Sequence, residues 1–169
     1  AKRADLEQMS KKQHSQKELA ANKRMAKKQI IGYLPNWSVY RRKHLVNPKT
    51  INYGKYTILN YSFFAPDQHG IIKSCDDYAD RFLLRADSNV VSRAHARGVK
   101  VMISLGGWTL STNFSKIASD PALRKVFANE CVRLLKEHDF DGIDIDWEYP
   151  TSSRIGGVEA DTKNFTLLL

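Results

Sequence analysis

The sequence predicts an α/β protein with a parallel sheet, which we interpret as the first half of a (β/α)8 TIM barrel. Strand-like and helix-like segments alternate from residue 29 to the end of the 169-residue chain, and such repetition produces parallel sheets. Acidic side chains line one face of the last strand-like segment, which suits an active site at the carboxyl ends of barrel strands. A complete barrel needs about 250 residues, so the four strands found here would make a partial barrel.

Four short runs rich in apolar, aromatic and β-branched residues are the expected strands. We place them at residues 30–34, 56–64, 100–105 and 140–149. The first two are closed by Pro35 and Pro66. A doubly wound open sheet is the alternative fold, but the residues at the end of the first strand, Gly32-Tyr33-Leu34-Pro35-Asn36, lack its glycine fingerprint.

Helical periodicity separates these strands. Residues 80–97 are expected to form one helix that stops at Gly98 and directs one face inward, namely Phe82, Leu83, Ala86, Val90 and Ala94. Ser119-Asp120-Pro121 opens a second helix, whose inward residues are Leu123, Phe127, Cys131, Leu134 and Leu135. A third helix begins at Asp161 and continues to the last residue, so we expect a truncated chain or a segment of a larger protein.

The net charge of +9 is unevenly distributed along the chain. Residues 1–28 hold nine Lys or Arg and three Asp or Glu, a balance of +6, which leaves +3 for the remainder. This segment has no Pro, Gly or aromatic residue and only a weak helical pattern. We therefore expect a basic N-terminal arm over residues 1–28, helical or disordered, ahead of a domain at residues 29–169. Nucleic-acid or anionic-surface binding by the arm is a nonspecific alternative, and no nucleic-acid partner is expected.

The composition excludes several classes of protein. A hydrophobic content of 42% and a charged content of 27% fit a soluble globular domain, and no apolar stretch is long enough to span a membrane. Two cysteines, Cys75 and Cys131, do not make a disulfide framework. The chain starts with Ala and shows no signal-type apolar segment, so either a leader has been removed or this is a fragment, and its compartment stays open.

The chemistry is concentrated in residues 140–150. Because side chains alternate along a strand, Asp144, Asp146 and Glu148 share one face, about 6.5–7 Å apart from one to the next. Burying unpaired charges is costly, so such a row is expected to have a function. Adjacent carboxylates also push their pKa values apart, which lets one stay protonated as an acid catalyst while its neighbour is ionised.

The acidic row has two other interpretations. An exposed edge strand fits poorly, because Ile143, Ile145 and Trp147 on the opposite face need cover and no Lys alternates with the acids. A magnesium or calcium site would use the same oxygen ligands, but a strand spreads them along a line rather than around a point. We therefore expect no metal and no cofactor.

The acidic residues also fit the pattern D-x-x-D-x-D-x-E, filled by Asp141, Asp144, Asp146 and Glu148, and residues 104–107 fit S-x-G-G. Together with residues 30–33 and 59–63, which look like the first two strands, these motifs make residues 29–169 resemble glycoside hydrolase family 18, the chitinases and their relatives. The resemblance implies a TIM barrel that hydrolyses β-1,4 bonds between N-acetylglucosamine units of chitin or chitooligosaccharides. It also favours a secreted or extracellular protein.

The resemblance implies a role for each acid. Glu148 would be the general acid that protonates the glycosidic oxygen. Asp146 would orient the substrate's own N-acetyl group, which attacks the anomeric carbon in a substrate-assisted retaining mechanism. Asp144 would share a proton with Asp146 and accept hydrogen bonds from Ser104 and Tyr33. Asp141 has the opposite parity and is expected to be structural, at the start of the strand.

Substrate-binding residues are implied around these acids. The candidates are Tyr33, Phe63, Ser104, Gly106, Gly107, Trp108 and Tyr149, with Trp37 undecided between a core position and a sugar platform. Family members also use side chains from the sixth and last strands, which four strands cannot supply. The isolated chain is therefore expected to be inactive and to self-associate through its open sheet edges. A noncatalytic chitin-binding, chitinase-like protein is the alternative.

Overall fold

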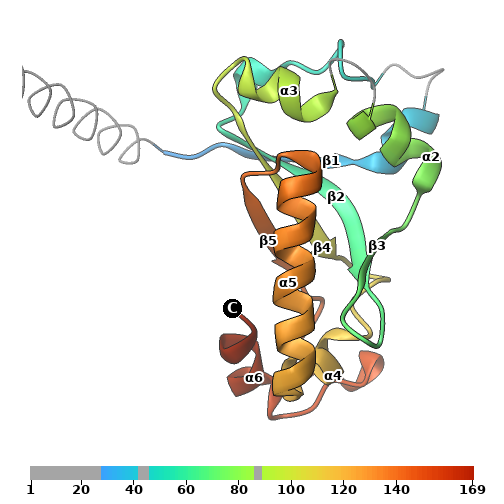
Figure 1. Cartoon of the computed structure of the whole chain (residues 1–169), viewed down its shortest axis with the longest axis vertical. Coiled ribbons are helices and arrows are strands. Elements are labelled where there is room, and N and C mark those ends of the chain that lie inside the picture. Colours follow the sequence, from blue (N-terminus) through green and yellow to red (C-terminus); the bar gives the residue numbers. More distant parts are fainter. Residues whose placement is uncertain (1–27, 42–45, 86–88) are drawn as a thin grey trace, which may run out of the picture. The chain divides into compact units, whose positions relative to one another are not determined.

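Four parallel strands and one short antiparallel strand form a single sheet. The computed structural model describes residues 28–41, 46–85 and 89–169. The strands are β1 (Ile31–Pro35), β2 (Ile58–Pro66), β3 (Ile72–Ser74), β4 (Lys100–Gly106) and β5 (Gly142–Asp146). The parallel strands follow the order β1-β2-β4-β5, and β3 pairs antiparallel with β2 (Figure 1). The predicted α/β class with a four-stranded parallel sheet is confirmed, whereas β3 was not expected.

The chain divides into two units, Ala1–Ile30 and Ile31–Leu169, and all five strands lie in the second. The basic arm predicted for residues 1–28 lies outside the described residues, apart from Lys28. Cys75 and Cys131 are both free thiols. No helix among the described residues combines the length and the apolar character needed to cross a bilayer.

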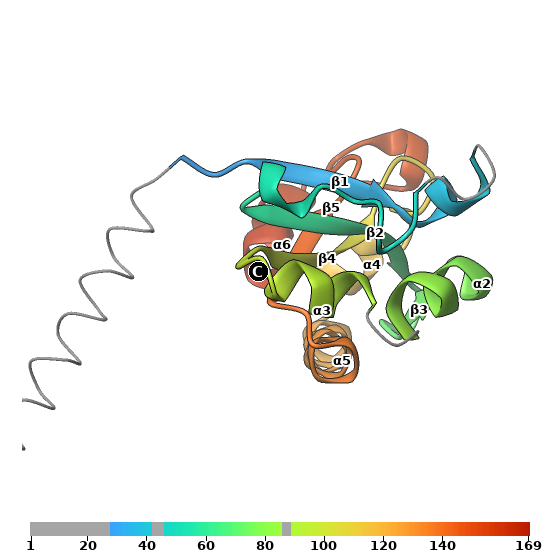
Figure 2. The same ribbon diagram turned by 90° about the horizontal axis from the view of Figure 1, so that it is seen from above.

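Six helices and three 3₁₀ turns connect the strands within the described residues. They are η1 (Asn36–Tyr40), η3 (Tyr53–Lys55), α2 (Asp77–Asp80), η4 (Arg81–Arg85), α3 (Val90–His95), α4 (Phe114–Ser119), α5 (Pro121–His138), η5 (Ser153–Ile155) and α6 (Asp161–Leu168). Helices α3 and α5 lie together on one side of β2 and β4 (Figure 2). Helix α5 begins where the sequence predicts. The Asp120 carboxylate accepts hydrogen bonds from the Ala122 and Leu123 amides, and Pro121 occupies the first turn.

The single helix predicted over residues 80–97 is wrong. The described part of this region forms α2, η4 and α3, which are separate elements. Asn89 begins a new helix because its side chain accepts a hydrogen bond from the Ser92 amide at 2.9 Å and donates to the Leu84 carbonyl at 2.8 Å. Phe82, which was expected to face inward, is exposed.

Asp80 provides a second reason for the break. Its carboxylate is buried and accepts hydrogen bonds from Asn36 Nδ2 at 3.1 Å, from the Tyr61 hydroxyl and from the Ser74 hydroxyl. Burial raises the pKa of Asp80, against the effect of its donors. A carboxylate with partners from β2, β3 and the segment after β1 fixes α2 by tertiary contacts that no local pattern encodes.

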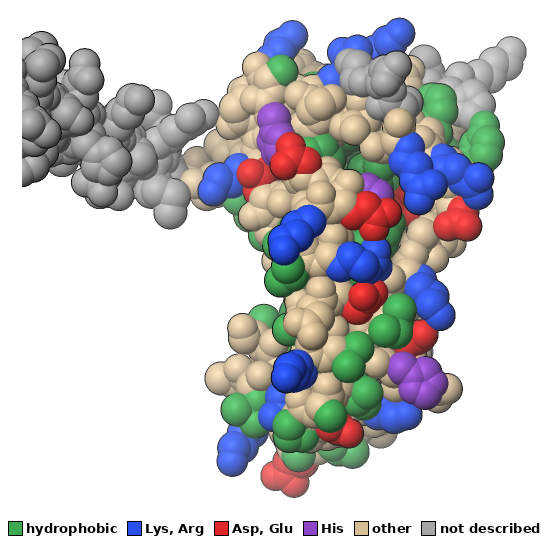
Figure 3. All heavy atoms as spheres, in the orientation of Figure 1, with side chains coloured by type: hydrophobic (Ala, Val, Ile, Leu, Met, Phe, Trp, Pro, Cys, Tyr) green, Lys and Arg blue, Asp and Glu red, His purple; other side chains and the backbone are tan. Residues whose placement is uncertain are grey.

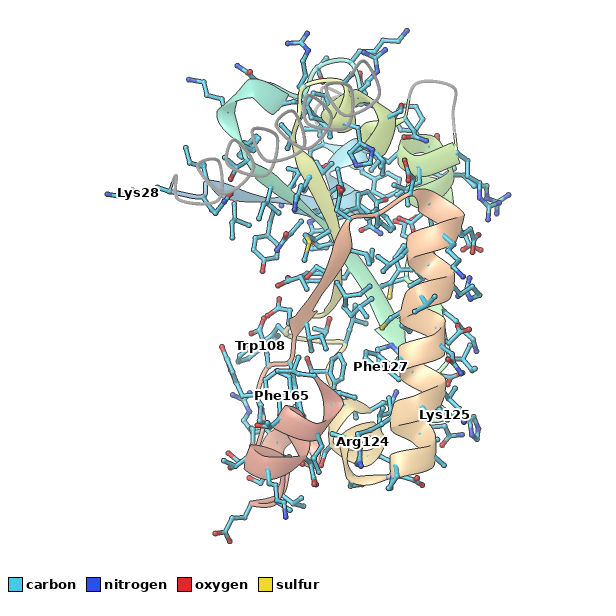
Figure 4. All side chains as sticks on the ribbon, turned by 60° about the vertical axis from the view of Figure 1, so that its left-hand side comes forward. Lys28, Trp108, Arg124, Lys125, Phe127 and Phe165 are labelled. Atoms are coloured by element: carbon cyan, nitrogen blue, oxygen red, sulfur yellow. The ribbon has the colours of Figure 1, made fainter. Side chains whose placement is uncertain are left out.

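The main core lies between the sheet and the helices. Val101, Ile103 and Leu105 alternate along β4 and are fully buried on the helix side. Phe127 and Leu134 of α5 face them as predicted, and Figure 4 shows Phe127 directed from α5 toward the strands. The opposite face of the sheet is therefore left for the polar side chains of the candidate site.

The solvent side of α5 carries interleaved basic and acidic side chains (Figure 3). Arg133 pairs with Glu130 at 3.0 Å and with Glu137 at 2.6 Å. Exposed ion pairs contribute little stability by themselves. Here, however, Arg133 and Glu130 also form hydrogen bonds with backbone groups of β3. Arg133 donates to the Ile72 carbonyl at 3.1 Å and Glu130 accepts from the Ile72 amide at 3.2 Å, so side chains of α5 cover the free edge of β3.

Candidate active site

The candidate residues gather where β4 and β5 end. Gly106 is the last residue of β4 and Asp146 the last of β5, and the two are register partners. Trp108 and Glu148 each follow two residues later. Because parallel strands end at one edge of a sheet, these side chains come together at the position where barrel enzymes place their chemistry.

Asp144 connects the two outermost parallel strands. Its Oδ2 accepts hydrogen bonds from the Tyr33 hydroxyl at 2.9 Å and from the Ser104 hydroxyl at 2.7 Å, the two donors that the family resemblance implies. Tyr33 lies on β1 and Asp144 on β5, with β2 and β4 between them. A flat sheet would hold those strands about 14 Å apart, so this hydrogen bond requires the strong curvature of a barrel wall.

Tyr33 remains a hydrogen-bond donor over a wide pH range. Burial is the largest cause that raises the pKa of its hydroxyl, and the adjacent Asp144 raises the pKa further, while a hydrogen bond with Asn60 lowers it. Ser104, the second donor, is fully buried on β4 directly opposite Asp144. The Asp144 carboxylate is thus an acceptor with two fixed donors.

Asp146 has a different environment. Burial raises the pKa of its carboxyl group, and the charges of Glu148 and Asp144 raise it further. Its backbone carbonyl accepts a hydrogen bond from the Gly107 amide at 2.7 Å. No hydrogen bond to its carboxyl group is found among the described residues. Asp146 therefore keeps its proton to a higher pH than an ordinary aspartate does, and its carboxyl group is available to a ligand.

Glu148 lies beyond the strand rather than within it. The prediction of one strand over residues 140–149 is wrong at both ends, because β5 covers only Gly142–Asp146. The alternation nevertheless continues, since Trp147 is 5% exposed and packs against Phe114 and Phe165, with ring centroids 5.6 and 5.4 Å away. With Trp147 held on the helix side, Glu148 stays on the side of Asp144 and Asp146.

The glycine pair makes a tight turn where β4 ends beside β5. Gly106 has φ 110° and Gly107 has φ 89°, in the region that side chains rarely adopt. A Cβ atom at Gly106 would lie 2.4 Å from the Asp146 carbonyl oxygen, and one at Gly107 would lie 2.9 Å from the Phe63 ring. Both positions require glycine for space as well as for conformation.

Gly106→Ala is expected to lower the free energy of unfolding by about 3 kcal/mol or more, because the backbone of β5 must move as well as adopt strain. Gly156→Ala is the matched control, since Gly156 has φ 74° and no atom within 4 Å of the added Cβ. Its expected cost is about 1–2 kcal/mol, the conformational cost alone. Denaturant unfolding measures both losses of unfolding free energy. Equal losses in the two variants would show that the close contact with Asp146 has no effect.

Aromatic side chains surround the acids on the open side. Trp108 is 58% exposed, meets Tyr149 edge to face at 6.2 Å and has the Arg154 guanidinium 5.3 Å from its ring centroid. In Figure 4 Trp108 lies beside the end of β5, on the side away from α5. Glu148 raises the pKa of the Tyr149 hydroxyl through a side-chain hydrogen bond and through its charge. A pocket of about 150 Å³ is lined by Trp108, Glu148, Tyr149, Ser152, Arg154 and Ile155.

Phe63 forms a second aromatic group on the β2 side. It occupies a bulge between Ser62 and Phe64 and stacks on Trp37 with ring centroids 6.0 Å apart. Trp37, which the sequence left undecided, is exposed and is therefore not a core residue. The Ser62–Phe63 and Glu148–Tyr149 peptide bonds are both cis.

Asp141 stands apart from the acidic row. Its Oδ2 accepts a hydrogen bond from the Val101 amide at 2.7 Å and lies 2.8 Å from His95 Nε2. Its own amide donates to the Val101 carbonyl at 2.8 Å. Asp141 thus ties the segment before β5 to β4 and to the end of α3, which is the position expected of it from its parity.

Three residues near the site were missed by the sequence analysis: Ser111, Arg154 and Asp161. The buried Asp161 carboxylate accepts from Ser115 Oγ at 2.7 Å, from the Thr151 amide at 3.1 Å and from the Val158 amide at 2.8 Å. It thereby holds the loop that follows Tyr149. The sequence marked Asp161 only as a helix start, and no local pattern marks Ser111 or Arg154.

A metal centre was the alternative use for the acids. Within the described residues, no three or more His, Cys, Asp or Glu side chains surround a common point that would hold a metal ion. The three carboxylates instead follow one another along β5 and the segment after it.

Comparison with known proteins gives relatives over the same residues. The chain is 37% identical over 152 residues to Chitinase 1 of Aphanocladium album, and the match covers 81% of this chain and 34% of the relative. It is 30% identical over 185 residues to Chitinase A1 of Niallia circulans, which covers 83% and 26%. The chain thus spans about a third or less of the length of these curated relatives.

Solved structures agree with the fold. Catalytic domain 2 of the Group II chitinase of Ostrinia furnacalis, as a mutant in complex with penta-N-acetylchitooctaose, superimposes with a TM-score of 0.73 at 30% identity. The match covers 83% of this chain and 38% of that one, so the four parallel strands form part of a TIM barrel. Residues 29–169 match the family described as glycosyl hydrolases family 18. The chain therefore belongs to glycosyl hydrolases family 18.

Proposed function

We propose that residues 29–169 supply the acid-bearing half of a barrel that hydrolyses β-1,4 bonds between N-acetylglucosamine units in chitin or chitooligosaccharides. The observation that carries the proposal is the connected row of carboxylates, in which Asp144 has two fixed donors, Asp146 has a raised pKa and Glu148 follows at the strand end. The names of the relatives, which are chitinases, and the sugar in one related structure support the substrate class.

The proposed reaction proceeds in two steps. Glu148 donates its proton to the glycosidic oxygen while the carbonyl oxygen of the substrate's N-acetyl group attacks the anomeric carbon, so the bond to the leaving sugar breaks as a ring closes. Water then attacks the same carbon, the ionised Glu148 accepts its proton, and the ring opens. This departs from the scheme with two enzyme carboxylates, because the nucleophile belongs to the substrate, but it also retains configuration.

Asp146 has the role of holding the acetamido group. Its carboxyl group lies between Asp144 and Glu148 in the row and is not hydrogen-bonded within the described residues. As an acceptor for the acetamido N–H, it stabilises the positive charge that develops there, an electrostatic effect in the transition state. Tyr33 and Ser104 both donate to Asp144 and hold it in place beside Asp146.

The aromatic residues supply the sugar contacts. Trp108 and Tyr149 line the pocket that contains Glu148, and Phe63 with Trp37 borders the β2 side. Flat aromatic surfaces suit the apolar faces of sugar rings. Gly106 and Gly107 let the backbone after β4 approach Asp146 and the Phe63 ring closely, which a side chain at either position would prevent.

The same proposal predicts the behaviour of the 169-residue polypeptide by itself. Ile31 and Tyr33 on β1 are more than half exposed, and the outer edges of β1 and β5 have no paired strand within the described residues. We expect this polypeptide to be inactive and to self-associate through these edges. Light scattering over a range of concentrations, alongside a cleavage assay, measures both properties.

The proposed activity is tested in a complete barrel that includes residues 29–169. Chitooligosaccharides and cellooligosaccharides of equal length are supplied, which differ in the acetamido group. We expect cleavage of the first and none of the second, because the nucleophile is the acetamido oxygen. Binding of chitooligosaccharides without cleavage would instead support the noncatalytic chitin-binding alternative.

A further inference from the structure

Ser111 lies where the loop after β4 meets the end of β5. Its side chain is 1% exposed. The hydroxyl oxygen accepts a hydrogen bond from the Glu148 amide at 2.9 Å and lies 2.8 Å from the Gly107 carbonyl and 3.1 Å from the Asp146 carbonyl. One buried hydroxyl therefore contacts the backbone of Gly107, Asp146 and Glu148.

These contacts use both the proton and the oxygen of the Ser111 hydroxyl. The single hydroxyl proton is shared between the carbonyls of Gly107 and Asp146, while the oxygen receives the Glu148 N–H. The Gly107 amide in turn donates to the Asp146 carbonyl at 2.7 Å. Since β5 ends at Asp146, these bonds replace the strand pairing that Glu148 lacks.

The segment is held from its apolar side as well. Trp147, between Asp146 and Glu148, is buried against Phe114 and Phe165. The packing of Trp147 holds residues 146–148 against the helix side. The hydrogen bonds of Ser111 hold the backbone of the same residues beside the glycine turn. The position of the Glu148 side chain follows from both.

We infer that Ser111 is a positioning residue, which orients Glu148 through the backbone of residues 146–148 so that its carboxyl group reaches the glycosidic oxygen. The inference rests on the proposed function, in which Glu148 is the general acid. A catalytic group must be held within about 0.5 Å of its productive position, and supporting residues provide that precision. A misplacement of 1 Å costs about 10²-fold in rate.

The test compares two substrates in a complete barrel that includes residues 29–169. A chitooligosaccharide has a poor leaving group and needs the proton from Glu148, whereas a dinitrophenyl N-acetylchitooligosaccharide has a leaving group that departs with little protonation. Ser111→Ala is expected to lower kcat about 10–10²-fold on the first substrate and less than about threefold on the second. A purely structural role would lower both rates together.

Three controls accompany the test. Ser119→Ala removes a hydroxyl that donates to the Lys116 carbonyl within α4, and it is expected to leave both rates unchanged. Ser111→Thr keeps the hydroxyl and should recover the rate on the chitooligosaccharide. Thermal midpoints check folding, and if Ser111→Ala does not fold, Ser111→Cys, with a weaker acceptor, is compared with Ser111→Thr in the same two assays.

The outcomes separate the inference from the proposed function. Equal losses on the two substrates, in a protein whose wild type cleaves both, overturn the role of Ser111 and leave the proposed function standing. An unmodified barrel that cleaves neither substrate overturns both. A selective loss on the chitooligosaccharide that threonine restores supports the positioning role.

Discussion

Replacement of Glu148 by Gln is expected to lower kcat for chitooligosaccharide hydrolysis about 10²–10⁴-fold in a complete barrel, which is the usual contribution of general acid catalysis. Gln keeps the shape of Glu but has no proton to give to the leaving oxygen. Substrate binding should change little, because the aromatic contacts of Trp108, Tyr149 and Phe63 remain. Initial rates and calorimetric titration with an oligosaccharide measure the two quantities separately.

Glu159→Gln is the matched control for this change. Glu159 is an exposed residue of the loop before α6, so the same chemical replacement there should leave kcat unchanged. A Glu148→Gln enzyme that keeps more than about a tenth of the wild-type rate would show that another group supplies the proton.

Asp146→Asn is expected to have opposite effects on activity and stability. Asn cannot offer the negative charge that stabilises the acetamido group, so kcat should fall about 10²–10³-fold, as when a comparable electrostatic contact is removed. Stability at pH 7 should rise, by less than about 1 kcal/mol because the group is partly solvated. An activity loss together with a stability gain is typical of a residue that is kept for function.

The pH dependence of this stability gain follows from the sign of the pKa shift. Burial, Glu148 and Asp144 raise the pKa of Asp146 above its ordinary value of 3.8, so the folded protein binds this proton more tightly than the unfolded chain does. Ionised Asp146 therefore destabilises the fold above the raised pKa. The advantage of Asn should shrink as the pH falls through the raised pKa and vanish below 3.8, where both states are protonated.

Asp141→Asn provides the contrast. The Asp141 carboxylate accepts from the Val101 amide and contacts His95, so its loss should lower stability at pH 7 by about 1–2 kcal/mol. Urea unfolding of both variants in complete barrels, at pH 7 and at pH 3, compares the two carboxylates. A loss of stability in Asp146→Asn at pH 7 would mean that its carboxylate is a structural acceptor like that of Asp141.

Local patterns predicted the parts of the fold that local forces decide. The strands β1, β2 and β4 follow from short runs rich in apolar, aromatic and β-branched residues, and α5 follows from Asp120 and Pro121 at its start. Gly106 and Gly107 were expected near the site from the S-x-G-G motif, and both adopt the positive φ that glycine allows. Period-2 alternation placed Asp144 and Asp146 on one face.

Tertiary contacts decided the features that were missed. Strand β3 has three residues, too few for a periodic signal, and is formed by pairing with β2 and by the side chains of Arg133 and Glu130. Asp80 interrupts a helical pattern through Asn36 and Tyr61, which are distant in the sequence, whereas Asn89 begins a new helix through local hydrogen bonds with Leu84 and Ser92. Ser111 acts on Asp146 and Glu148 across more than 30 positions, a contact that no spacing reveals.

We propose that Glu148 is the general acid and that the substrate's own N-acetyl group is the nucleophile, a combination that retains the configuration at the anomeric carbon. The most direct measurement is the anomeric form of the first product, followed by proton NMR during the first minutes of chitooligosaccharide hydrolysis by the complete barrel, before mutarotation. The account predicts that the β-anomer appears first and the α-anomer only later. Initial release of the α-anomer would mean direct attack by water on the opposite face and would contradict the roles given to Asp146 and Glu148.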